Sequence, residues 1–406
     1  MILLKNCFYI ESPEAPDGGN GWDILIQSPT IRQISPEIDE GELGSAAGGE
    51  ALDVIDASRC VVVPGFVNTH HHFFQTLTRA LPEAQDAKLF DWLVYHYEVW
   101  KHVNEEAVRA STMLAVGELL KTGCTTTSDH HYLYPRGFEG DLVATQFAAA
   151  GHLGIRFSPS RGSMSLSKKD GGLPPDSVVQ TDDEILRESE HAIQRFHDSS
   201  DFSMRRITLA PCSPFSVTPE LMKETAQLAR THGVKLHTHL AETQDEDAFC
   251  LETFGKRPLA LMEECDYLGP DVYYAHGIFF TDDELDLLAK TQTGVSHCPS
   301  SNMRLGSGIA RVAEMRARGV PVSIGVDGSA SNDTSDYLGE MRNALLLQRV
   351  KYGSDAIGAR DILEAATLGG AHALGFDRVG RVETGWAADL ALFDVHRFEY
   401  AGALED

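Results

Sequence analysis

The segment GFVNTHHHFFQ places three consecutive histidines, His70, His71 and His72, directly after the apolar run VVVPGF. His70 and His72 are two residues apart, so on a strand their side chains face one side and His71 faces the other. Two imidazoles on one face can hold a metal ion between them. The spacing therefore favours His70 and His72 as metal ligands, with His71 turned away.

Further ligand-type residues occur at the ends of later apolar runs, and one of these runs repeats the two-residue spacing. They are His237 and His239 in LHTHLAE, Glu242 three residues further on, His276 in VYYAHG, His297 in SHCP and Asp327 in SIGVDG. A single histidine at a strand end is usually a hydrogen-bonded structural residue. Several imidazoles buried with a carboxylate would be costly to desolvate without a compensating cation. Zinc is held by such nitrogen and oxygen ligands, often with one position open for water.

A bound divalent ion can lower the pKa of water from about 15.7 to about 7, which provides a nucleophile near neutral pH. Such a site also needs a group that moves protons. Glu242 is the candidate because it follows the histidine pair closely and carries its own carboxylate. The segment AETQDED is also rich in acids, so a solvated surface position for Glu242 stays open.

Other catalytic signatures are absent from the sequence. There is no HExxH motif, GxSxG elbow, Walker loop or GxGxxG motif. The zinc deaminases that act on nucleic acids need HxE followed by PCxxC. HYE occurs at 96–98, but PCSPF has Phe215 where the second cysteine should stand. These reaction classes are therefore excluded.

The elements that must position the histidines are apolar runs of strand length that alternate with amphipathic helical segments. This alternation predicts parallel strands with helical crossovers. Eight such units can close into a (β/α)8 barrel, whose active site lies at the carboxyl ends of the strands. A doubly wound open sheet is the alternative. The eight runs span 61–72, 125–131, 155–161, 207–215, 234–242, 272–277, 293–299 and 320–328.

Three helices have clear boundary signals. The segment 104–123 begins with Asn104 as a cap, continues with two glutamates and ends at Gly123. The segments 218–233 and 281–294 each open with threonine and acids and close near glycine.

The two ends of the chain differ from the middle. The first sixty residues hold short β-rich pieces separated by turn residues such as PEAPDGGNG, and GRVETGWAADLALFDV near the end has the same character. This is typical of small antiparallel strands joined by turns, and both ends are expected to form one small β unit.

Composition excludes several partners. Lys plus Arg number 34 and Asp plus Glu number 60, which gives a formal charge of −26 over 406 residues. Such a chain repels nucleic acid and acidic membrane surfaces. No membrane span or leader peptide is evident, and the seven cysteines are scattered without a CxxC pair. We therefore expect a cytoplasmic protein that binds neither nucleic acid nor membranes.

The segments VNTHHHFFQ, HTHLAET, AHG, HCPSSNMRLGSG and GVDGSASND resemble the amidohydrolase superfamily, in its cytosine/guanine deaminase and triazine hydrolase branch. The resemblance implies a distorted (β/α)8 TIM-type barrel over 64–376. It also implies a small composite β-sandwich domain built from 1–63 and 377–406. One divalent metal, zinc with iron as the alternative, would be held by His70, His72, His239 and Asp327.

The resemblance also implies roles for other residues. Glu242 takes the place of the proton shuttle, and His276 and Asp327 orient the attacking water. Gln75 and Arg161 match positions that contact the ring of a purine, although a turn cap and a surface ion pair are their structural alternatives. Trp92, Tyr132 and Asn302 could line the pocket or only pack in it.

The finer resemblance concerns the substrate. TRALPEAQDAKLFDWL, SDHHYLYP, SRGSMS and DGGLPPDSVV are similar to members that deaminate 8-oxoguanine to urate and ammonia. Isoxanthopterin, guanine and aminotriazines remain alternative substrates. Hydrolysis of a cyclic amide or a C–Cl bond, and a non-catalytic barrel scaffold, remain alternative functions. The resemblance further implies a homo-oligomer. Because such chains usually continue past Asp406 with more strands, it implies a reduced small domain or a truncated reading frame.

Overall fold

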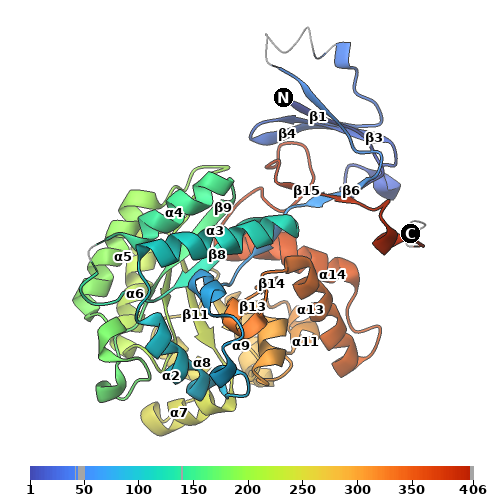
Figure 1. The fold of residues 1–406 in the computed structure, drawn as a ribbon. Helices are drawn as coiled ribbons and strands as arrows, with labels where there is room; N and C mark the ends of the chain where they lie inside the picture. Colours follow the sequence, from blue (N-terminus) through green and yellow to red (C-terminus); the bar gives the residue numbers. More distant parts are fainter. Residues whose placement is uncertain (42, 44–50, 139, 403–406) are drawn as a thin grey trace.

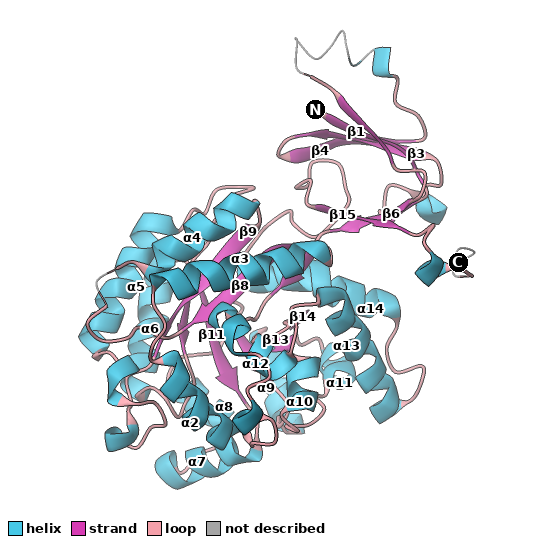
Figure 2. Cartoon of the chain, in the orientation of Figure 1, coloured by secondary structure: helices cyan, strands magenta, loops and turns pink. Residues whose placement is uncertain are grey.

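The computed structural model describes residues 1–41, 43, 51–138 and 140–402, and in it a large helix-covered barrel carries a separate unit of small sheets (Figures 1 and 2). The last four residues, on which the expectation about the chain end falls, lie outside the described residues. No helix in the described part is long and apolar enough to cross a lipid bilayer.

The barrel consists of eight parallel strands in the order β14-β13-β12-β11-β10-β9-β8-β7. Each predicted apolar run overlaps one barrel strand, and neighbours in the chain are neighbours in the sheet. The barrel prediction is therefore confirmed and the doubly wound alternative is wrong. The strands are β7 (Phe66–Asn68), β8 (Cys124–His131), β9 (Arg156–Ser163), β10 (Thr208–Pro211), β11 (Lys235–Leu240), β12 (Val272–His276), β13 (Gly294–His297) and β14 (Val322–Ile324).

The barrel closes between its first and last strands through hydrogen bonds that lie just beyond the strand ends. The Thr69 amide donates to the Ile324 carbonyl at 3.1 Å, and the Asp327 amide donates to the His70 carbonyl at 3.0 Å. The Val326 amide donates to Asn68 Oδ1 at 2.9 Å. The seam of the barrel thus ties together the two chain segments that carry His70 and Asp327.

Helices cover the outside of the barrel, and the predicted capping residues occupy their helix ends. Asn104 accepts from the Ala107 amide, and Thr218 accepts from the Leu221 amide. Thr281 forms a capping box with Glu284. The helices are α2 (Leu89–Trp100), α3 (Glu105–Lys121), α4 (Leu142–Leu153), α5 (Asp182–Phe196), α6 (Pro219–His232), α7 (Gln244–Phe254), α8 (Pro258–Glu264), α9 (Asp282–Thr291), α10 (Pro299–Arg304), α11 (Val312–Arg318), α12 (Ser329–Asn332), α13 (Tyr337–Tyr352), α14 (Ala359–Glu364), the π-helical η6 (Ala365–Gly369) and α15 (Gly370–Leu374).

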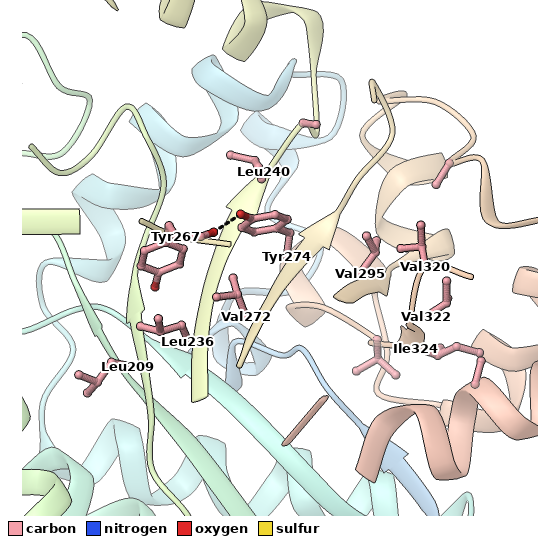
Figure 3. Close-up of a cluster of buried hydrophobic side chains, with 14 of the residues drawn as sticks. Leu209, Leu236, Leu240, Tyr267, Val272, Tyr274, Val295, Val320, Val322 and Ile324 are labelled. Atoms are coloured by element: carbon pink, nitrogen blue, oxygen red, sulfur yellow. Dashed lines mark hydrogen bonds between the residues drawn. The ribbon is translucent and has the colours of Figure 1, made fainter. Parts of the chain in front are cut away.

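The main core lies between the strands and these helices. Figure 3 shows Leu236 and Leu240 of β11 beside Val272 and Tyr274 of β12, and the Tyr274 hydroxyl donates to the Tyr267 carbonyl. Side chains alternate along a strand, so the residues between these apolar ones face the barrel interior. Packing of the leucines on the helices therefore turns the histidines of β11 inward.

The first predicted run, 61–72, is not one strand. It divides into β6 (Cys60–Pro64), which belongs to the small unit, and β7 of the barrel, with Gly65 between them. A Cβ atom at Gly65 would lie 2.0 Å from Thr125 Oγ1, so only glycine fits where the chain crosses from one unit to the other.

The small unit contains two sheets built from both ends of the chain. One has the order β4-β3-β1-β5 and the other the order β15-β6-β2, with Leu4, Ile24 and Val62 buried between them. The pairs β1–β5 and β2–β6 are parallel, so the prediction of antiparallel strands is wrong for them. Their strands are β1 (Ile2–Cys7), β2 (Tyr9–Ile10), β3 (Trp22–Gln27), β4 (Thr30–Ser35), β5 (Asp53–Asp56) and β15 (Leu390–Asp394).

A buried ion pair joins the barrel to the segment that enters β15. Arg156 of β9 is 2% exposed and donates through Nε and Nη2 to the two carboxylate oxygens of Asp389, at 2.8 and 3.0 Å. The Asp389 carbonyl also accepts from the Gly65 amide at 2.8 Å. This aspartate therefore fixes both connections between the barrel and the small unit.

Asp389→Ala is expected to lower the free energy of unfolding by about 3–5 kcal/mol, because the buried Arg156 guanidinium keeps its carbonyl partners but loses its counter-charge. Asp394→Ala is the matched control, since its partner Arg59 is 57% exposed and an exposed pair contributes at most about 1 kcal/mol. Urea unfolding of both variants measures the difference. Equal midpoints would contradict the importance of the Arg156–Asp389 pair.

Candidate metal and active site

Four of the predicted ligands meet at the carboxyl-terminal end of the barrel. His70 Nε2 lies 3.3 Å from Asp327 Oδ1, and His72 Nε2 lies 3.4 Å from the same oxygen. His72 Nε2 also lies 3.1 Å from His239 Nε2. Ligands held at about 2.0–2.2 Å in a tetrahedron around zinc lie about 3.3 Å from one another. These three distances match the spacing of ligand atoms around a single small cation, and His70 belongs to both groups of side chains that could hold one, His70/His72/His130/His239 and His70/His276/Asp327.

Hydrogen bonds on the far side of each ring show which nitrogen faces the centre as an acceptor. His72 Nδ1 lies 2.7 Å from the His130 carbonyl, and His239 Nδ1 lies 2.6 Å from the Cys212 carbonyl. A carbonyl can only accept, so both Nδ1 atoms carry the proton and both Nε2 atoms present lone pairs. Two lone pairs 3.1 Å apart cannot form a hydrogen bond. A cation between them satisfies both.

His70 obtains the same orientation through His237. His237 Nδ1 donates to the Tyr273 carbonyl at 2.9 Å, which leaves its Nε2 to accept from His70 Nδ1 at 2.8 Å. His70 Nε2 then also points a lone pair into the site, and it has no hydrogen-bond partner in the described part of the chain. Carbonyl and imidazole partners of this kind fix the tautomer of metal-binding histidines. The donor set fits a divalent metal.

Charge in the cluster agrees with this role. Burial lowers the pKa of His70 and lowers that of His72 to about 3. Burial acts to raise the pKa of Asp327, but the surrounding imidazoles of His70, His276 and His72 outweigh it and hold that pKa well below its usual range. Neutral imidazoles and an ionised carboxylate are the protonation states that a metal requires. His71 lies outside this cluster and contacts Ser335 Oγ through Nε2 at 2.9 Å, as expected.

Glu242 lies beside the metal ligands and is 5% exposed, so the solvated-surface alternative is wrong. Its Oε2 atom is 3.6 Å from His276 Nε2. Burial raises the pKa of Glu242 to about 7, although the neighbouring His276 opposes the shift. A carboxyl group with a pKa near neutrality can both accept and donate a proton.

A second glutamate holds the backbone at Glu242. The two oxygens of Glu246, at the start of α7, accept from the Ala241 amide at 3.0 Å and the Glu242 amide at 2.9 Å. Ala241 has a φ of +55°, a left-handed conformation that is unfavourable for alanine. The Glu246 carboxylate therefore stabilises the turn that aims Glu242 at the site.

His276 reaches the site through a similar backbone distortion. By alternation it would face the same side as Val272 and Tyr274, which pack against the helices. Its φ of +73° breaks the alternation, and its Nε2 lies 3.9 Å from Asp327 Oδ2. Its Nδ1 donates to Asn302 Oδ1 at 2.9 Å. Asn302 is thus held behind His276 rather than in the cavity wall.

A narrow cavity opens next to the cluster, with the ligand residues on one side and mainly apolar side chains on the other. Of the predicted substrate contacts, Gln75, Trp92 and Tyr132 line this cavity. The remaining lining residues are His72, Leu89, Leu93, Tyr97, Cys212, Phe215, His239, Glu242, His276, Leu305, Asp327 and Ser331. A lining of mainly apolar side chains with a few polar groups is typical of a small-molecule binding site.

Arg161 does not lie in this cavity. Its guanidinium stacks on the Tyr134 ring at 3.7 Å and donates to Gln180 Oε1 at 2.8 Å. It faces a different cavity, which α4 and α5 also line. The predicted contact of Arg161 with a substrate therefore has no support in this geometry.

Sequence reasoning did not assign roles to His237, Glu246 or Tyr97. His237 belongs to the same HTH motif as His239 and lies two residues before it on the same face of β11. The sequence therefore indicates that His237 faces the barrel interior, but not that it orients His70. Glu246 and Tyr97 have no motif that distinguishes them from other helical residues. His130, which also belongs to the buried histidine cluster, was visible only as part of the run TTTSDHH.

The chain was compared with known proteins. The model of the "Amidohydrolase family" matches residues 61–404. An 8-oxoguanine deaminase of Pseudomonas aeruginosa is 49% identical over 348 residues, which cover 86% of this chain and 77% of that protein. An isoxanthopterin deaminase of an unknown prokaryotic organism is 38% identical, with 93% and 82% covered. The structure of atrazine chlorohydrolase from Arthrobacter aurescens TC1 complexed with zinc is similar, with a TM-score of 0.92, 28% identity, and 99% of this chain and 89% of that chain covered.

His237→Leu is expected to weaken zinc binding about 10–100-fold, because His70 loses the partner that fixes its tautomer. His131→Leu is the matched control: His131 is also a buried barrel histidine, but its Nε2 only contacts the Leu133 carbonyl. Competition with a chromogenic chelator measures the zinc affinity of the folded variants. Equal affinities for wild type and His237→Leu would show that His237 does not orient His70.

Proposed function

We propose that this chain, which belongs to the amidohydrolase family, is a zinc-dependent aminohydrolase that converts 8-oxoguanine to urate and ammonia. The observation that carries the chemistry is the convergence of three imidazole lone pairs and the Asp327 carboxylate beside a buried glutamate. The choice of substrate rests on the 49% identity to an 8-oxoguanine deaminase.

In the proposed site His70, His72, His239 and Asp327 hold the metal ion. When bound, such an ion lowers the pKa of water and so supplies a nucleophile near neutral pH. The reaction adds water across C2 of the purine: a C–O bond forms, the C–N bond to the amino group breaks, and ammonia leaves.

Glu242 is the residue suited to move the protons of this reaction. Its carboxyl group lies next to the metal ligands and has a pKa raised to about 7 by burial. Asp327 or Glu242 accepts the first proton of the attacking water, and Glu242 delivers it to the ring nitrogen. The second proton, from the hydroxyl group now on C2, passes through the same carboxylates to the amino group, which leaves as ammonia while the C2 carbonyl forms. His276 and Asp327 lie on either side of this path and orient the water. The apolar wall of the cavity excludes other water from the reacting carbon.

The proposal includes expectations that rest on the sequence and on the family. The native ion is zinc, with iron as the alternative. The protein is cytoplasmic, acts on a small heterocycle and forms a homo-oligomer. The domain bounds are 1–63 plus 377–406 for the small unit and 64–376 for the barrel.

The substrate is tested by measuring ammonia release from 8-oxoguanine, isoxanthopterin, guanine and an aminotriazine with purified enzyme of known metal content. We expect the highest kcat/KM for 8-oxoguanine and zinc as the bound metal. Chloride release from a chlorotriazine tests C–Cl hydrolysis in the same series. A higher kcat/KM for any other compound would replace 8-oxoguanine as the substrate.

Glu242→Gln is expected to keep the bound metal and to lower kcat about 10²–10⁴-fold, because an amide cannot shuttle protons. Glu252→Gln, on the exposed side of α7, is the matched control and should leave kcat unchanged. Ammonia release and metal content are measured on the same samples. Wild-type turnover in Glu242→Gln would remove Glu242 from the mechanism.

A further inference from the structure

One wall of the active-site cavity comes from the single helix α2. It contributes Leu89, Trp92, Leu93 and Tyr97, whose spacing places them on one face of the helix. Leu89 and Leu93 offer only apolar surface to a ligand lying against them, and Trp92 offers its ring and an indole N–H. Tyr97 differs because it carries a hydroxyl group into this wall.

The Tyr97 hydroxyl has no hydrogen-bond partner among the described residues, although the side chain is only 1% exposed. Buried hydroxyl groups in proteins are almost always hydrogen-bonded, because leaving one unpaired is unfavourable. A hydroxyl that is unpaired in a cavity wall therefore points to a ligand atom as its partner.

Gln75 shows the same property at another part of the cavity. Its Oε1 atom is buried without a partner, and its amide packs so closely on Gly328 that a Cβ there would lie 1.9 Å from Oε1. Gly328 follows the metal ligand Asp327, so Gln75 belongs to the metal side. Tyr97 comes from α2, which supplies none of the proposed metal ligands. The cavity thus offers one unpaired acceptor beside Asp327 and one unpaired hydroxyl on a different element.

We propose that Tyr97 is a specificity-determining residue whose hydroxyl donates a hydrogen bond to a ring carbonyl remote from the amino group under attack. This inference rests on the proposed function, and for 8-oxoguanine the acceptor is the oxygen on C8. Burial raises the pKa of Tyr97 well above its usual range, so its hydroxyl stays protonated and able to donate. Guanine lacks the C8 oxygen and leaves the hydroxyl unpaired.

The expected consequence of this hydrogen bond is that the enzyme prefers rings with the additional carbonyl group over the same rings without it. A site built to hydrogen-bond a substrate group discriminates strongly against the analogue without it, because the buried partner is then left unsatisfied. The same reasoning applies to isoxanthopterin, which carries a carbonyl that pterin lacks. Leu89 and Leu93, which share the helix face of Tyr97, have no polar side-chain atom that could replace the hydrogen bond.

The test compares Tyr97→Phe with wild type on two substrate pairs, 8-oxoguanine with guanine and isoxanthopterin with pterin. We expect kcat/KM for the carbonyl-bearing member to fall about 10–100-fold, while that for the member without the carbonyl changes less than about 3-fold. The selectivity ratio should therefore collapse with metal content unchanged. Tyr95→Phe is the matched control, since Tyr95 lies on the same helix and its hydroxyl donates to Glu83 outside the cavity.

The outcomes separate this inference from the proposed function. An active wild type whose selectivity ratio is the same in Tyr97→Phe overturns the role of Tyr97 and leaves the deaminase proposal standing. Activity on the pterin pair alone, with its ratio collapsing in Tyr97→Phe, overturns 8-oxoguanine as the substrate and supports Tyr97. A wild type inert toward both pairs overturns both proposals.

Discussion

The arrangement of the whole barrel end depends on three imidazole nitrogens that present lone pairs to one another in a dry environment. His72 and His239 approach to 3.1 Å with their protons committed to backbone carbonyls on the far side of each ring. Without a positive charge between them this arrangement is repulsive, and burial prevents the rings from gaining protons to relieve it. The close approach of these unprotonated nitrogens therefore requires a cation between them.

Two of the proposed ligands, His70 and Asp327, lie at the seam between the first and last strands of the barrel. The Asp327 amide donates to the His70 carbonyl, so the hydrogen bond that closes the sheet also sets the distance between two ligands. His239 comes from the opposite part of the sheet, on a strand whose leucines are fixed in the core between sheet and helices. A change that loosens the closure would therefore separate the ligands as well as destabilise the fold.

The order of strands and helices could be predicted from the sequence, because alternation and capping are local patterns. Each of the eight apolar runs overlaps a barrel strand, and Asn104, Thr218 and Thr281 all cap helices. The proposed ligand set came from the family resemblance, because spacing alone also left other strand-end histidines open. What could not be predicted depends on backbone conformation or on contacts between distant segments. The resemblance predicted His276 at the site, but no spacing rule reveals the left-handed backbone that breaks strand alternation there. Arg161 was placed by resemblance at the substrate, whereas its strand position turns it away from the metal. The division of the first run at Gly65 depends on a contact with Thr125.

The proposed metal ligands and the proposed proton-transfer groups of the site also differ in backbone conformation. The ligands His72 and His239 have their ring protons bound to carbonyls and are held rigidly. Glu242 and His276 are the groups proposed to transfer protons and to orient the water. Glu242 follows the left-handed residue Ala241, and His276 is itself left-handed. The Glu246 carboxyl group accepts from the Ala241 and Glu242 amides and so stabilises the strained backbone there. In the proposed function, recognition of the ring falls partly to a third element, α2, which lines the cavity and supplies no proposed ligand or proton carrier. Under this proposal the side chains of α2 can change with the substrate while the metal and proton chemistry stay the same. Such a separation would give a physical reason why relatives with similar folds bear the names of deaminases and of a chlorohydrolase.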